Sequence, residues 1–493
     1  MIDFIIKLIL VLLVVFTPIA FGSIDVWAFS LMELGIFLIM ILWSAQNLSL
    51  GFHPAIRDPR PAASPDSELK AGNSKLSRSA IRHPQFVIIL LFLLLVLFQM
   101  LPLPPAILKL ISPRTYDLRS ILSPFSFQLS ALSSELSFPI SLVSFGTQIE
   151  FFKWLAYFGL FLFLLHWRAF RDDRSITRHL LLALLLVGFA ESLYGMLEFF
   201  SGHKHILNLE GEALVSSVTG TFINRNYFAG YLLMVIPLSL GYLFSREGFQ
   251  RTRFTGWRNR LSSLDGKSAL IAFGIVVMVL ALLFSASRMG IMSLLLSFSL
   301  ISFLFRNPGR ERGSSKTAVL IFSLAVLWAA WIGLDAVISR FFTVSEGFQE
   351  RWRIWADTFR IFKDFPLLGS GLGTFTQIFP SYRSFYIRGV VTHAENDFLQ
   401  LLSEVGLVGM GLLAILFSYL FLKAVSEIRS LSRRDPQRYI AIGGMVGILA
   451  LMFHSLVERN IQVPSNAFLY TVLWAIVLKV SVRSPMTQRR DTK

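Results

Sequence analysis

Twelve apolar stretches, each close to the length that crosses a bilayer, dominate this sequence. A hydrocarbon core of ~30 Å needs roughly 20 apolar residues of α-helix, and backbone groups inside it must be satisfied within helices or closed barrels. We therefore predict an all-α, polytopic membrane helix bundle of about 12 transmembrane helices. The predicted spans are 4–21, 27–45, 86–103, 151–167, 179–200, 226–245, 268–284, 289–305, 317–334, 398–422, 439–456 and 466–482.

The overall composition supports this class. Hydrophobic residues make up 54% of the 493 residues and charged residues only 15%, which lies outside the usual range of a soluble enzyme. Because the spans take up most of the chain, we predict one polytopic domain over 1–493. The segment 46–84, rich in Pro, Ser and basic residues, is predicted to be a cytoplasmic linker, and 335–397 a large periplasmic loop.

The distribution of basic residues predicts the orientation. With the N-terminus placed in the cytoplasm, the connections on that side carry about twice as many Lys and Arg as the opposite side, as the positive-inside rule requires. Both termini are then cytoplasmic. The net charge of +16 follows from this topology, so we expect no nucleic-acid partner.

Residue types and motifs that are absent from the sequence exclude some kinds of functional site. The chain has no cysteine, which rules out disulfides, a cysteine nucleophile and thiolate metal ligands. No Asp-x-Asp pair of the kind used by metal-dependent transferases occurs in the sequence. We therefore expect neither a metal nor a cofactor.

The large loop 335–397 contains an aromatic stripe at helical spacing, formed by Phe348, Trp352, Trp355, Phe359 and Phe362. It predicts an amphipathic helix, and two interpretations stay open: the stripe meets lipid at the outer surface, or it packs against neighbouring helices. The following "PLLGSGLGTF" lacks the context of a phosphate loop. For it we predict a tight turn that brings the backbone close to a neighbour.

Three arginines are placed where positive charge is unusual, at the outer boundary of the predicted spans: Arg225, Arg288 and Arg351. Guanidinium groups bind phosphate oxygens in a bidentate manner, so the three indicate a pyrophosphate site. In the alternative interpretation, each arginine extends to lipid headgroups or pairs with a buried carboxylate. The candidates for that carboxylate are Glu191, Glu198 and Glu404.

A polar cluster stands just before the tenth predicted span: His393, Glu395, Asn396 and Asp397. A histidine with neighbouring carboxylates can act as a general base, because its pKa is close to neutral pH. The alternative is that His393 is a hydrogen-bonding loop residue without a catalytic role.

Four motifs in order carry a resemblance to a known family. They are "GTFINRNYFAGYL", "SASRMG", "RWRIWADTFRIFKDFPLLGSGLGTF" and "THAENDFLQLLSEVGLVG". Over about 147–475, the chain resembles the O-antigen ligase and O-antigen polymerase superfamily of bacterial envelope proteins. In one place it departs from many relatives, since Glu395 stands where they have a second histidine.

This resemblance implies a glycosyltransferase of the bacterial inner membrane that uses a lipid-linked glycan donor, usually undecaprenyl pyrophosphate, on the periplasmic face. His393 or Glu395 would be the base that activates an acceptor hydroxyl, and Arg225, Arg288 and Arg351 would hold the pyrophosphate. The expected supporting residues are Asn224, Asn226, Asn396, Asp397 and Glu404.

Several alternatives stay open. Ligase and polymerase share these motifs, so the acceptor is a glycan, a lipid or a protein. A lipid-oligosaccharide flippase or another polytopic transporter also needs many helices and membrane-embedded charges. A scaffold without catalytic activity would leave the three arginines without an explanation.

Overall fold

A computed structural model describes residues 1–51, 84–122, 137–202, 205–207, 209–210, 217–246, 265–305, 322–323, 327, 345–387, 389–432 and 435–480. Most of these residues are helical. In these ranges the named strands are β1 (His205–Ile206) and β2 (Leu209–Glu210), which form one small antiparallel pair. The predicted all-α class is confirmed.

Eight helices of the described ranges are long and apolar enough to cross a membrane. They are α1 (Ile2–Ile19), α2 (Val26–Gly51), α7 (Ser144–His166), α9 (Arg174–Ser201), α10 (Arg225–Ser245), α13 (Gly266–Phe284), α19 (Asp397–Ser430) and α20 (Pro436–His454). Two shorter apolar helices accompany them, α4 (Pro84–Met100) and α14 (Arg288–Leu304). The last helix of the described residues is α21 (Pro464–Val480). The chain is thus a polytopic membrane protein.

Some predicted segments lie outside the described residues or differ from the observed helices. The predicted span 317–334 lies almost entirely outside the described residues, so the number of twelve spans stays a prediction. The predicted linker 46–84 is also largely outside them, but its first residues extend α2 to Gly51. Of the loop 104–148, the described parts include two short helices, α5 (Pro105–Ile111) and α6 (Pro113–Leu122).

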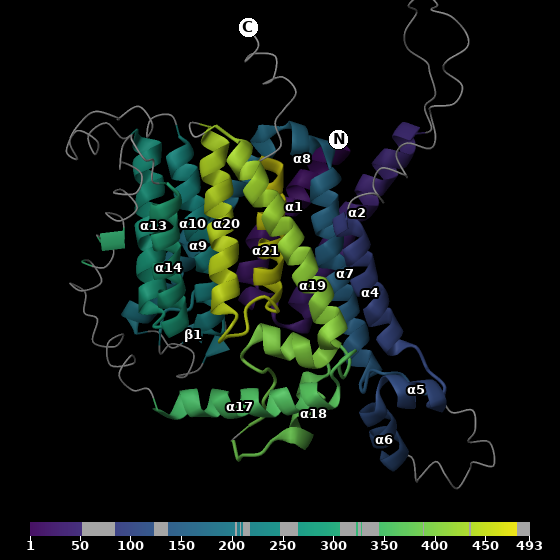
Figure 1. Ribbon diagram of the computed structural model, residues 1–493. Helices are drawn as coiled ribbons and strands as arrows, with labels where there is room; N and C mark the ends of the chain where they lie inside the picture. The colour runs from purple at the N-terminus through teal and green to yellow at the C-terminus, as the bar shows by residue number, and fades with distance from the viewer. Residues whose placement is uncertain are drawn as a thin grey trace, which may run out of the picture.

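Polar contacts show which helix ends of the described residues lie together. The Trp167 indole Nε1 after α7 donates to Asp3 Oδ1 in α1 at 2.7 Å. Lys479 Nζ in α21 donates to Thr177 Oγ1 in α9 at 2.6 Å. The start of α1 and the end of α21 therefore lie at the same end, and Figure 1 shows α17 and α18 at the opposite end.

Helix α10 forms the centre of the bundle. It contacts α9, α13, α14, α20 and α21, and its residues from Asn226 to Ser245 are buried. A helix buried on all sides must be apolar on all sides. Its contact with α20 is close because small residues allow it: a Cβ added to Gly443 would lie 2.4 Å from the Pro237 carbonyl oxygen.

Helix α17 (Ser345–Asp364) lies across the end of the bundle, next to α18 (Phe375–Tyr382). Its buried side includes Ile354 and Ile361, whereas Trp352 is 62% exposed and Phe359 is 43% exposed. The amphipathic helix is therefore confirmed. Packing against neighbouring helices does not account for Trp352 and Phe359.

Helix α19 is interrupted at Gly406, which has φ 64° and ψ −170°. The glycine-rich segment before α18 binds the backbone at this interruption, where Leu407 N donates to the Pro366 carbonyl at 2.8 Å. A Cβ at Gly369 would lie 2.2 Å from the Glu404 carbonyl oxygen. The predicted tight turn with close backbone approach is confirmed. Irregular backbone at membrane depth must be satisfied by protein, and here the turn satisfies it.

Candidate active site

Two of the predicted arginines begin helices that lie side by side. Arg225 is the first residue of α10, and Arg288 is the first residue of α14. A Cβ at Gly290 in α14 would lie 2.9 Å from the Ala229 Cβ in α10, so the first turns of the two helices are adjacent. Helix N-termini carry partial positive charge and favour anions, so both arginines lie in an electropositive part of the bundle.

The capping residues explain why these helices start where they do. The Asn224 side chain accepts a hydrogen bond from Asn226 N at 2.8 Å, and Ser287 Oγ accepts one from Gly290 N at 3.2 Å. At the start of α19, Asn396 Oδ1 accepts one from Leu399 N at 3.0 Å. Asparagine and serine are favoured at N-caps. Asn224 and Asn396 therefore have a structural role that the sequence analysis did not assign.

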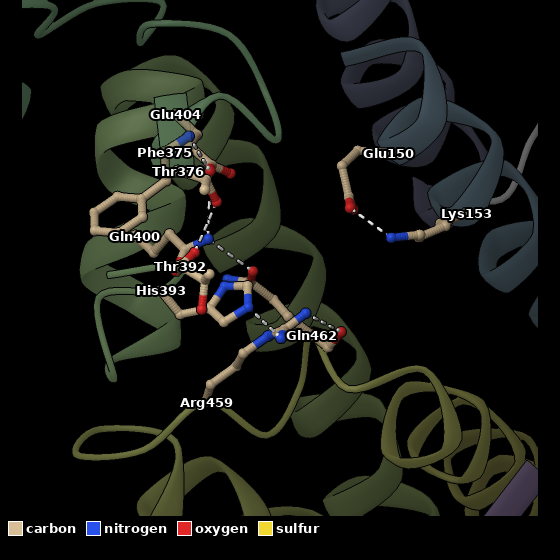
Figure 2. A network of polar contacts seen from close by, with 10 residues as sticks. All are labelled: Glu150, Lys153, Phe375, Thr376, Thr392, His393, Gln400, Glu404, Arg459 and Gln462. Atoms are coloured by element: carbon tan, nitrogen blue, oxygen red, sulfur yellow. Dashed lines mark hydrogen bonds and ion pairs between the residues drawn. The ribbon is translucent and has the colours of Figure 1, made fainter. Parts of the chain in front are cut away.

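His393 lies at the same end and contacts Arg459, as Figure 2 shows. Arg459 Nη1 donates a hydrogen bond to His393 Nε2. Because arginine has no acceptor atom, the imidazole nitrogen must accept, so its proton is on Nδ1. Burial lowers the pKa of His393 to about 2, and the charges of Arg459 and Lys153 act in the same direction. The imidazole is therefore neutral.

Three helices hold the segment that carries His393. Trp355 Nε1 in α17 donates to the Ala394 carbonyl at 3.0 Å. Thr376 Oγ1 in α18 donates to the Thr392 carbonyl at 2.9 Å, and Ala394 N donates to Gln400 Oε1 in α19 at 3.0 Å. These bonds fix the backbone on both sides of His393.

Glu404 joins the glycine-rich turn to this network, and it pairs with no arginine of the described ranges. Its Oε1 accepts from Phe375 N at 3.2 Å and from Gln400 Nε2 at 3.3 Å. Gln400 Nε2 also donates to Gln462 Oε1 at 3.1 Å. The predicted supporting residue Glu404 thus connects α18, α19 and the connection between α20 and α21.

Asp397 positions that last connection, which we call the 455–463 loop. Its Oδ2 accepts from Asn460 N and from Ile461 N, both at 2.7 Å. Asp397 N in turn donates to the Ser455 carbonyl at 3.1 Å. The carboxylate is 1% exposed, so the loop is bound to the N-terminus of α19.

Arg351 pairs with a carboxylate of the 455–463 loop. Its Nη1 lies 2.6 Å from Glu458 Oε1, and the Glu458 side chain is 4% exposed. Burial raises the pKa of Glu458, and the Arg351 charge opposes this. Asn226 of α10 lies next to Glu458. Arg351 thus pairs with a buried carboxylate, and Glu458 was not among the candidates for it.

The three candidates have other partners. Glu191 Oε2 accepts from Thr221 N at 2.8 Å, and Glu198 Oε2 lies 3.3 Å from His205 Nδ1. Glu404 accepts from backbone and amide groups, as described above.

A polar face of α7 lies opposite His393 and Arg459 (Figure 2). Glu150, Lys153 and Tyr157 follow at spacings of three and four, which places them on one side of the helix. Lys153 Nζ pairs with Glu150 Oε1 at 2.7 Å. Glu33 of α2 interacts electrostatically with both. The sequence analysis missed this face, although charges within a predicted span could have indicated it.

The sequence analysis also missed Glu458, Arg459 and Gln462. They lie between two predicted spans, in "VERNIQ", where a charged pair in a short outer connection was the available signal. Arg459 and His393 are 66 positions apart, and no local pattern joins them.

Many buried polar atoms near His393 have no hydrogen-bond partner among the described residues. Buried polar atoms are usually paired, so unpaired ones gathered in one place indicate a site for ligand or water. They are His393 Nδ1, Glu395 Oε2, Asp397 Oδ1, His454 Nε2, Glu458 Oε2, Arg459 Nε and Gln462 Nε2. Glu395 has φ 51°, a conformation that is strained for residues other than glycine.

A comparison with protein families decides which class this site resembles. Residues 273–414 match the family model described as O-antigen ligase. This segment is therefore similar to an O-antigen ligase domain. It contains Arg288, Arg351, His393 and Glu395, and the resemblance noted in the sequence is confirmed over this range. Arg225 and Arg459 lie outside it. A search of curated proteins found no match to the chain.

Proposed function

We propose that this protein is a membrane glycosyltransferase of the O-antigen ligase or polymerase type. It moves a glycan from an undecaprenyl-pyrophosphate carrier to an acceptor hydroxyl on the periplasmic face of the inner membrane. One observation carries the proposal: a neutral, buried His393 lies among unpaired polar atoms at one end of the bundle, within the O-antigen ligase domain.

The reaction requires a base and a stabilised leaving group. His393 takes the proton of the acceptor hydroxyl, and the acceptor oxygen bonds to the anomeric carbon. The bond between that carbon and the pyrophosphate oxygen breaks, and its electron pair stays on the pyrophosphate. Arg225 and Arg288, at adjacent helix N-termini, stabilise the negative charge that results.

The remaining residues support this reaction. Arg351, already paired with Glu458, keeps the 455–463 loop in place beside the pyrophosphate. Glu395, strained and with an unpaired carboxylate oxygen, orients the acceptor hydroxyl toward His393. We assign the base to His393 because its imidazole is neutral and can take a proton, with Glu395 as the alternative.

A lipid-oligosaccharide flippase is the second candidate. The interruption of α19 at Gly406 favours it, because transporters often place broken helices at their binding sites. In this protein, however, the glycine-rich turn binds the backbone groups near the break. This arrangement favours a rigid site over a moving one.

A deletion strain tests the function. We expect the lipid-linked donor to accumulate on the outer leaflet, whereas a flippase would leave it on the inner leaflet. Mass analysis of the envelope glycans separates the two activities: loss of chain length indicates a polymerase, and loss of attachment indicates a ligase.

Complementation with variants tests the site. His393→Ala and Arg288→Ala should fail to restore glycan transfer at wild-type protein levels. The matched controls, His179→Ala in α9 and Arg429→Ala in α19, change exposed residues and should restore it. Near-normal transfer by both site variants would refute the assignment.

A further inference from the structure

The contact between His393 and Arg459 conflicts with the role of a base. A base needs a free lone pair, yet Nε2 of His393 accepts a hydrogen bond from Arg459, and Nδ1 carries the proton. Both ring nitrogens are therefore engaged. His393 is thus unable to take a proton from an acceptor until Arg459 moves.

Arg459 is placed so that it can move. Apart from the contact with His393, its guanidinium donates to the Gln462 carbonyl at a long 3.5 Å. Its buried Nε has no partner within the described part of the chain. Tyr227, in the first turn of α10 and two positions after Arg225, forms a side-chain hydrogen bond with Arg459. Arg459 thus lies between the imidazole and the helix N-terminus at which the proposed function puts the pyrophosphate.

We infer that Arg459 blocks His393 before the donor binds and transfers to the pyrophosphate when it binds, which frees Nε2 to act as the base. This inference rests on the proposed function. The anion competes well for Arg459, because a guanidinium binds phosphate oxygens in a charge-assisted, bidentate manner, whereas neutral imidazole offers one lone pair.

Proton transfer requires the same movement. When Nε2 takes the acceptor proton, His393 becomes a cation, and a guanidinium in contact with it would repel it. The other charged group that acts on His393 is Lys153 of α7, which pairs with Glu150. Once Arg459 has moved, its charge stabilises the leaving group, and His393 is protonated beside an anion.

This arrangement makes Arg459 a residue of the catalytic site that contacts the donor. It also imposes an order, since the acceptor is activated after the donor is bound. The sequence analysis assigned pyrophosphate binding to three other arginines, and Arg459 lies outside the segment that matches the O-antigen ligase model.

Nuclear magnetic resonance of ¹⁵N-histidine-labelled full-length protein in nanodiscs tests the inference. The chain has eight histidines, and His393→Gln assigns the signal. Farnesyl diphosphate serves as the probe for the donor. In the free protein, the His393 Nε2 signal should be that of a hydrogen-bonded, unprotonated nitrogen. Farnesyl diphosphate should shift this signal and raise the titration midpoint of His393 by about one pH unit or more.

In Arg459→Gln, the titration midpoint of His393 should be raised without any probe. Farnesyl diphosphate should then change the His393 Nε2 signal far less than it does in wild type. Arg383→Gln, which removes an exposed cation after α18, is the control and should behave as wild type. The inference is overturned if His393 responds to the probe equally in wild type and Arg459→Gln, or if wild type does not respond.

Transfer activity separates this inference from the proposed function. With donor lipid extracted from the deletion strain, Arg459→Gln should reduce transfer by about tenfold or more. Arg459→Lys should recover part of it. If the deletion strain shows no donor accumulation, the proposed function fails. If donor accumulates but Arg459→Gln transfers normally, only the inference about Arg459 fails.

Discussion

Arg351 in α17 and Glu458 in the 455–463 loop form an ion pair of 2.6 Å, and the carboxylate is almost completely buried. The pair joins the helix that lies across the end of the bundle to the loop that carries Arg459. Trp355 of the same helix binds the Ala394 carbonyl next to His393. Helix α17 therefore holds both sides of the His393–Arg459 contact.

Removing one partner of this pair should destabilise the protein. Glu458→Gln leaves Arg351 without its counter-charge, and the loss of a charged hydrogen bond costs about 2 kcal/mol. Thermal unfolding in detergent should show a lower midpoint. The double variant Arg351→Leu/Glu458→Leu should recover part of the loss, because no unpaired charge is then left. An unchanged midpoint for Glu458→Gln would show that the pair does not stabilise the fold.

The low pKa of His393 predicts a pH-dependent stability. The unfolded chain binds a proton at His393 below pH ~6.5, and the folded protein does not bind one until about pH 2. Stability is therefore lost as the pH falls below 6.5, by ~1.4 kcal/mol per unit. Compared with wild type, His393→Gln should lose less stability between pH 6.5 and pH 5. Parallel pH profiles of unfolding for the two proteins would contradict the buried, neutral imidazole.

Replacing Glu395 with glycine should raise the stability of the protein and lower its transfer activity. Its φ of 51° is unfavourable for a side chain and acceptable for glycine, so Glu395→Gly should stabilise the protein by about 1 kcal/mol. Transfer should fall, because the carboxylate near His393 is lost. Glu395→Gln keeps the strain and should lower transfer without raising the unfolding midpoint. A less stable Glu395→Gly would show that the carboxylate itself supports the fold.

The glycine-rich turn should not tolerate a larger residue. Gly369→Ala puts a Cβ 2.2 Å from the Glu404 carbonyl oxygen at φ 74°, so about 3 kcal/mol or more of stability should be lost. Gly411→Ala is the matched control: its Cβ meets nothing within 4 Å, and alanine favours helix by ~1 kcal/mol. Expression and unfolding midpoints of the two variants provide the test. Equal behaviour would contradict the tight approach between the turn and α19.

Hydropathy predicted much of the helical architecture, because a bilayer imposes a minimum length and an apolar composition on every span. It placed α10 at 226–245 and α13 at 268–284, and the observed helices begin at Arg225 and Gly266. It did not predict the interruption of α19 at Gly406, because the break depends on the turn at 366–371, which supplies the partners for the exposed backbone groups.

Sequence reasoning named some residues of the candidate site and missed others. Spacing and residue type singled out His393, Arg225 and Arg288, since charged and titratable groups at a membrane boundary are unusual. Arg459 was not found, because its contact with His393 depends on how Asp397 holds the 455–463 loop. The partner of Arg351 was missed for the same reason. Such contacts join segments far apart in the chain, and periodicity carries no information about them.

The release of undecaprenyl pyrophosphate tests the central claim most directly. Purified wild-type protein is incubated with donor lipid and acceptor membranes, both taken from the deletion strain. The account predicts that pyrophosphate carrier is released in step with glycan transfer. His393→Gln should reduce both by a factor of about 10² or more, and His179→Gln should leave both unchanged. Transfer by His393→Gln at the wild-type rate, or no release by wild-type protein, would contradict the account.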